Sequence, residues 1–73
     1  MPVTRQNVDS VFSYHAPKGT QPVAYETIRA KAKELAHTIL DCTPQCADQQ
    51  AALRQLRECV MTANAAVALE GEV

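Results

Sequence analysis

The chain has 73 residues, a formal net charge of −1 at pH 7 and 47% hydrophobic residues. A chain this short forms one domain, and its core rarely supplies more than about 3–5 kcal/mol, so it usually needs disulfides, a metal or copies of itself. The hydrophobic content argues against disorder. The near-neutral charge argues against a DNA-binding protein, which is typically basic.

The sequence gives no sign of a membrane or an export segment. No apolar run approaches the roughly 18 residues of a membrane span, and the first ten residues, MPVTRQNVDS, lack the apolar core of a secretory signal. We therefore expect no membrane partner and a cytosolic protein, in which cysteines are mostly reduced.

The first 21 residues are expected to form an arm that precedes the first helix. The arm holds two of the chain's three aromatic residues, Phe12 and Tyr14, in the polar stretch FSYHAPKG, together with His15 and Lys18. We interpret Phe12 as a ring that packs the arm on the rest of the chain. Tyr14, which has polar neighbours on both sides, is the better candidate for contacting a ligand.

Residues 22–42 are predicted to form the first helix. Pro22 suits the first helical position, where its missing N–H is no loss. Pro44 cannot continue the helix, and it also pushes the residue before it out of helical geometry. One apolar stripe follows steps of three and four positions. Its members are Tyr25, Ile28, Ala32, Leu35, Ile39 and Cys42.

The three cysteines raise the question of a zinc site. Cys42 and Cys46 have C-x3-C spacing, and His37 is nearby. Cys59 would be the third cysteine ligand, but it lies 13 positions beyond Cys46. A helical interval of that length spans about 20 Å, whereas zinc ligands lie only about 2.0–2.3 Å from the metal. We therefore expect no metal and no other cofactor.

Residues 47–69 are predicted to form the second helix. Cys46 occupies the position where a serine cap is usual, Asp48 places a negative charge in the first turn, and Gly71 marks the exit. The apolar stripe comprises Leu53, Leu56, Val60, Ala63 and Val67. Because only about four residues separate the helices, they must run antiparallel. The predicted fold class is all-α: a single domain, 1–73, containing a two-helix hairpin and an N-terminal arm.

A two-helix hairpin cannot bury both apolar stripes by itself. The run ANAAVA, residues 63–68, places alanine on almost every face of the second helix. These alanines are either simple helix formers or small residues that pack against other subunits. Asn64 is then expected to be a buried polar group that is hydrogen-bonded across an interface. We expect a homo-oligomer.

The sequence offers little for catalysis. It has two glycines and no glycine-rich phosphate loop. Cys42 and His37 lie five positions apart near a helix terminus, which is not the spacing of three or four that would align them. We therefore expect no catalytic residues and no enzymatic activity.

The sequence contains more residues suited to binding a ligand than to catalysis. Arg29 and Lys33 are four positions apart, hence neighbours on one helix face. That face is either a solvated basic surface or a binding site. An arm folded back along the helix would bring Tyr14 close to Arg29. A ring on which a base stacks and a guanidinium that pairs with phosphate are the minimum for binding a nucleotide.

Three segments carry a resemblance to a known family. They are F-x-Y-H-x-P in the arm, Y-x-x-I-R-x-x-A-K-x-L-A in the first helix, and A-x-x-x-L-R-x-x-V-M-x-A-N-A-A-x-A in the second. The pattern, from Phe12 to Leu69, resembles small phage hairpin proteins related to the anti-CBASS and anti-Thoeris sponges. These proteins sequester the cyclic nucleotide messengers of bacterial immunity.

The resemblance implies an interlocked homohexamer, active in the host cytoplasm, that binds cyclic dinucleotides such as cyclic GMP-AMP between paired subunits. By the same resemblance, Tyr14 would stack on a base and Arg29 would pair with phosphate, where the anti-CBASS proteins carry lysine. His15 and Lys33 complete the predicted site. Some members also bind cyclic trinucleotides at separate sites, and here a second site would draw on Arg54 and Arg57.

Two other interpretations remain open from the sequence. The same hairpin oligomer could be a structural or protein-interaction module that uses its arm for assembly or for a protein partner. A small hydrolase is the third interpretation and the least supported.

Overall fold

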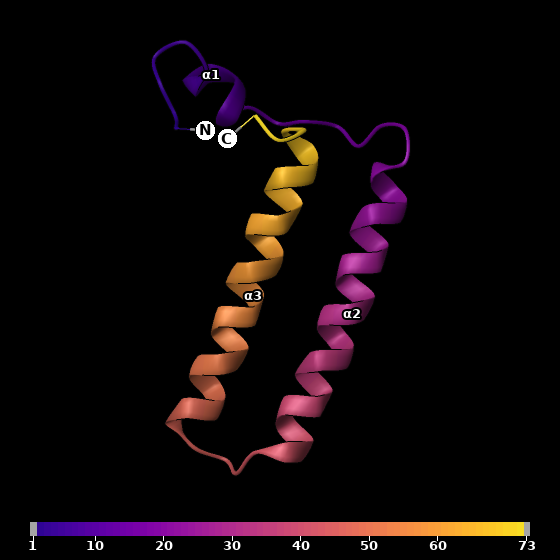
Figure 1. Ribbon diagram of the computed structural model, residues 1–73, viewed down its shortest axis with the longest axis vertical. Helices are drawn as coiled ribbons and strands as arrows, with labels where there is room; N and C mark the ends of the chain where they lie inside the picture. Colours follow the sequence, from indigo (N-terminus) through magenta and orange to yellow (C-terminus); the bar gives the residue numbers. More distant parts are fainter. Residues whose placement is uncertain (1, 73) are drawn as a thin grey trace.

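The computed structural model describes residues 2–72 and has three helices within them. Their bounds are Val8–Val11 for α1, Gln21–Cys42 for α2 and Ala47–Ala68 for α3. α2 and α3 lie side by side and antiparallel, and α1 lies near the C-terminal end of α3 (Figure 1). No strand occurs in residues 2–72. The prediction of an all-α helical hairpin is therefore confirmed.

A proline lies near each end of the long helix α2: Pro22 in its first turn and Pro44 just after its last residue. It starts at Gln21, one residue before the predicted range, and Pro22 lies in its first turn. Backbone N–H groups there have no partner within the helix, so the proline costs nothing. The helix ends at Cys42, and Thr43 adopts an extended conformation with φ −124° and ψ 150°. That conformation is the one that Pro44 imposes on its predecessor.

The turn between α2 and α3 is closed by side chains of its own residues. Cys46 is the N-cap of α3, and its Sγ accepts a hydrogen bond from the Gln49 backbone N–H at 3.5 Å. The Gln49 amide reaches back, and its Nε2 donates to the backbone oxygen of Thr43 at 3.2 Å and to Oγ1 at 3.1 Å. Gln49 is 6% exposed and is the one buried residue in the described part of the chain.

α3 ends in a Schellman motif one residue before the predicted end at position 69. The Gly71 N–H donates to the Ala66 carbonyl oxygen, and the Glu70 N–H donates to that of Val67, both at 3.2 Å. Glu70 and Gly71 have φ values of 54° and 79°. Only Gly71 is a residue that adopts such angles without steric cost.

The arm does not take the path along the first helix that would bring Tyr14 close to Arg29 (Figure 1). It includes the four-residue helix α1, which the sequence did not predict, and it crosses the open end of the hairpin from α3 to α2 (Figure 1). Three polar contacts hold this path: Ser10 Oγ to Glu72 Oε2 at 3.0 Å, Lys18 Nζ to Glu70 Oε1 at 3.2 Å and Gln21 Nε2 to the Val67 carbonyl oxygen at 2.9 Å.

One hairpin alone has almost no core. No apolar side chain among residues 2–72 is buried, and Leu35, Leu40 and Met61 are exposed by 48%, 49% and 61%. The described chain measures 46 × 26 × 17 Å, so it is too thin for side chains to be covered on both sides. No helix within residues 2–72 combines the length and apolar character needed to span a membrane.

Candidate ligand-binding face

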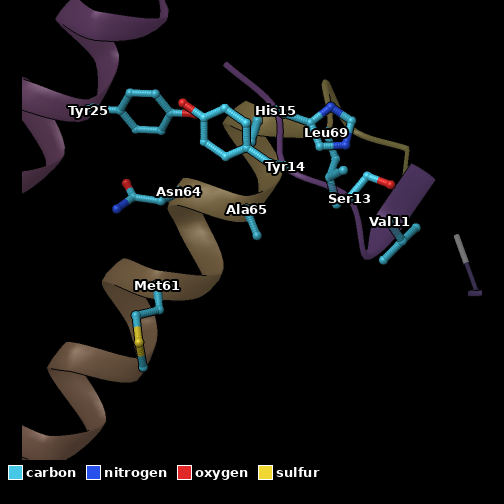
Figure 2. A pocket seen from close by; sticks show the side chains of 10 residues that line it. Val11, Ser13, Tyr14, His15, Tyr25, Met61, Asn64, Ala65 and Leu69 are labelled. Atoms are coloured by element: carbon cyan, nitrogen blue, oxygen red, sulfur yellow. The ribbon is translucent and has the colours of Figure 1, made fainter. Parts of the chain in front are cut away.

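One face of the hairpin carries a hollow at its open end, which we call the aromatic hollow. It has a volume of about 370 Å³. Tyr14 enters it from the arm and Tyr25 from α2, while Met61 and Asn64 come from α3 (Figure 2). The remaining lining residues are Val11, Ser13, His15, Ala65, Ala68 and Leu69. Two rings at one hollow give flat surfaces on which a base can stack.

Tyr14 and His15 differ in how firmly the arm holds them. Tyr14 is 86% exposed, so its ring is free to contact another molecule. His15 is half-buried, and its Nε2 lies 2.7 Å from the carbonyl oxygen of Ser10, which keeps the ring within the fold of the arm. His15 therefore shapes the hollow, whereas Tyr14 presents a surface.

Asn64 carries an unusual polar atom at this hollow. Its Oδ1 is buried and has no hydrogen-bond partner within the described chain. Figure 2 shows its amide extending from α3 on the same side as the Tyr25 ring. Buried polar atoms are nearly always hydrogen-bonded, so an unpaired one calls for a partner from outside.

A second hollow, which we call the basic groove, lies between α2 and α3 on the same face. It has a volume of about 630 Å³, with Arg29 and Lys33 from α2 and Arg57 from α3 along its border. Its apolar lining consists of Ala32, Ala36, Leu40, Leu53, Leu56, Val60 and Met61. Met61 also borders the aromatic hollow. The two hollows therefore adjoin at this side chain.

The cations of the basic groove have no carboxylate partner in the described chain. The ion pairs among residues 2–72 join Lys18 to Glu70 and Lys31 to Glu34, and neither involves a side chain of the groove. Three uncompensated positive charges around an apolar floor attract an anion whose body is flat or apolar.

The structure thus distributes the predicted site residues over two adjoining hollows. Tyr14 and His15 border the aromatic hollow, and Arg29 and Lys33 border the basic groove. Within one chain Tyr14 and Arg29 share a face but not a hollow. Of the pair predicted for a second site, Arg57 borders the basic groove, and Arg54 borders neither hollow. Tyr25, which the sequence placed only in an apolar stripe, borders the aromatic hollow as a second ring.

The other face of the hairpin combines small and apolar residues with polar ones such as Lys31 and Glu58. Two further hollows there share Cys59 and Ala63, and Ile28 and Leu35 border one of them. All three cysteines are free and exposed. No group of three His, Cys, Asp or Glu residues within positions 2–72 could hold a metal ion.

The fold and this face define a small helical-hairpin protein with a ring-lined and cation-lined surface. A protein-family model described as "Acb2/Tad1, hairpin domain" matches residues 5–68, so the chain belongs to this family. Acb2 and Tad1 are phage anti-CBASS and anti-Thoeris sponges for cyclic nucleotides, and the predicted resemblance is confirmed. No curated protein and no solved structure matches the chain.

Proposed function

We propose that this protein is a phage anti-defence protein that binds cyclic oligonucleotide immune messengers and sequesters them without cleaving them. The observation that carries the proposal is the single face on which an aromatic hollow adjoins a basic groove, in a chain of the Acb2/Tad1 hairpin family. Bases would stack at the aromatic hollow, and phosphates would pair with the cations of the groove.

In a symmetric dimer, the two hollows of each subunit would match the two-fold symmetry of a cyclic dinucleotide. In a two-fold dimer every residue appears twice across the axis, so two Tyr14 rings and two Arg29 side chains would face one ligand. A cyclic dinucleotide also presents two bases and two phosphates. Stacking contributes about 1–3 kcal/mol per base, and a charge-assisted hydrogen bond about 1.5–3 kcal/mol. Two of each give about 5–12 kcal/mol before the cost of association.

The proposal includes an assembly and a place of action. Homohexamers of interlocked hairpins in the host cytoplasm would hold cyclic dinucleotides, such as cyclic GMP-AMP, between paired subunits. Cyclic trinucleotides would use a second site that includes Arg54, and also Arg57 at the border of the basic groove. No side chain is assigned a catalytic role, so the messenger is removed from its receptor by binding alone.

A structural or protein-interaction oligomer is the alternative. The observation that favours it is the apolar face around Cys59 and Ala63, which packing alone would explain. A thermal-shift screen with cyclic di- and trinucleotides separates the two functions, because a ligand that binds only the folded state must raise the melting temperature. No shift with any of these nucleotides would favour the structural function.

Two substitutions test the binding face by calorimetry. We expect Tyr14→Ala to weaken binding of a cyclic dinucleotide by at least about tenfold, because stacking is lost at both bases. Arg29→Glu should abolish binding, because repulsive charges then face the phosphates. Arg54→Glu makes the same charge change outside both hollows and should leave cyclic dinucleotide binding intact. Full-strength binding by Arg29→Glu would rule out this site.

The fate of the bound nucleotide tests sequestration against hydrolysis. Heat denaturation of the loaded protein should release a nucleotide that chromatography shows to be chemically unchanged. Recovery of a linear product would replace the proposed sponge with an enzyme.

A further inference from the structure

The Asn64 carboxamide is the one polar side-chain group at the aromatic hollow that has a buried atom without a hydrogen-bond partner in the described chain. Its Oδ1 is buried and unpaired within residues 2–72, and its Nδ2 takes no part in any hydrogen bond of the described chain. A carboxamide offers an acceptor beside a donor. Whatever fills this hollow can therefore satisfy Asn64 fully only by presenting a donor beside an acceptor.

The neighbours of Asn64 indicate that a flat ring fills this place. Tyr14 and Tyr25 border the same hollow (Figure 2), and Tyr14 is 86% exposed. A base that stacks on a ring presents its edge sideways, in the plane where hydrogen bonds form. Asn64 borders the hollow, and its carboxamide meets such an edge once rotation of the side chain uncovers Oδ1, which is buried in the ligand-free chain.

We propose that Asn64 selects adenine as the base held at the aromatic hollow. Adenine presents its N6 amine beside N7, and asparagine pairs with both: Oδ1 accepts from N6–H and Nδ2 donates to N7. At the same edge guanine presents two acceptors, N7 and O6, and O6 would face the buried Oδ1. The inference rests on the proposed function, and it assigns adenine-containing cyclic nucleotides as the preferred ligands.

Calorimetry with cyclic di-AMP and cyclic di-GMP on the intact protein tests this selection. A bidentate pair of this kind discriminates between bases by about 1–3 kcal/mol, which is about 5- to 150-fold in affinity. We expect the wild-type protein to bind cyclic di-AMP at least about tenfold more tightly than cyclic di-GMP. Equal affinities, or a preference for cyclic di-GMP, would overturn the inference and leave the proposed function standing.

Two variants of the same side chain locate the cause. Asn64→Leu removes both polar atoms at similar size, so the ratio of the two affinities should fall to about one while the oligomer mass is unchanged. Asn64→Asp keeps the acceptor for N6–H and loses the donor to N7, so it should weaken binding of cyclic di-AMP while still disfavouring guanine, whose two acceptors at this edge would face a carboxylate. If Asn64→Leu weakens both ligands equally, or dissociates the oligomer, Asn64 is an interface residue and the inference is wrong. If the wild-type protein binds neither nucleotide, the inference and the cyclic dinucleotide function both fail.

Discussion

Gln49 shows how one side chain can hold the turn of a hairpin that has almost no core. It lies at the third position of α3, and its Nε2 donates to both the carbonyl oxygen and the hydroxyl of Thr43. The two bonds link the first turn of α3 to the residue that ends α2. Because Gln49 is 6% exposed, water competes little for its amide.

We expect Gln49→Ala to lower the free energy of unfolding by about 1–3 kcal/mol, because two hydrogen bonds of a buried amide are lost. Urea unfolding followed by circular dichroism measures the effect. Gln45→Ala is the matched control, since Gln45 is exposed in the same turn and takes part in no hydrogen bond of the described chain. Equal stability of the two variants would show that the contacts of Gln49 contribute nothing to the hairpin.

The role of a single residue could be predicted from the sequence where that role depends only on neighbouring residues. Pro44 ends a helix through its own ring, and Cys46 caps α3 through the backbone three residues on, so both roles could be inferred from position alone. Tyr25 and Arg57 were assigned incompletely for the opposite reason. Whether each borders a hollow depends on how α2 and α3 are rotated against each other, and spacing within one helix does not determine that rotation.

At the scale of elements, the hairpin has two chemically distinct faces. Ala32, Leu56 and Val60 border hollows on both faces and therefore form the line along which the helices meet. Arg29, Lys33 and Arg57 lie on one side of that line. The other side carries the small residues around Cys59 and Ala63, together with Lys31. This division allows one face to bind a ligand while the other packs against a second hairpin.

We expect Ala63→Leu to disrupt the oligomer, because extra methylene groups in a tight contact cost about 1–3 kcal/mol per site. Ala63 is half-buried and borders both hollows of the small-residue face. Ala30→Leu is the control, since Ala30 is exposed on α2 and borders none of the four hollows. Tyr14→Ala should also leave assembly intact. Sedimentation velocity that gives one mass for all four proteins would contradict this use of the face.

The long helices could be anticipated from the sequence, but the path of the arm could not. α2 and α3 follow apolar spacing and proline positions that act within a few residues. The arm is held by Ser10 and Glu72, which are 62 positions apart, and by Lys18 and Glu70. Such pairs form only once the hairpin has brought the two ends of the chain together, so no local pattern reveals them.

For the whole molecule, the lack of buried apolar side chains is the physical reason to expect that several copies of the chain associate. A hydrophobic core is the dominant favourable contribution to folding, and none is complete among residues 2–72. Both long helices nevertheless carry apolar residues at helical spacing that are left partly or largely exposed. Association of several hairpins would cover these side chains and supply the missing burial.

The melting temperature of the ligand-free protein should therefore rise with protein concentration. When unfolding is coupled to dissociation, each tenfold increase in concentration stabilises a chain of a hexamer by about 1 kcal/mol. For a domain of this size that corresponds to about 4–8 °C. Differential scanning calorimetry over a hundredfold range of concentration measures the shift, and sedimentation equilibrium on the same samples reports the mass. A melting temperature that stays constant over this range would show that single hairpins fold alone, and the homo-oligomer would then lose its physical basis.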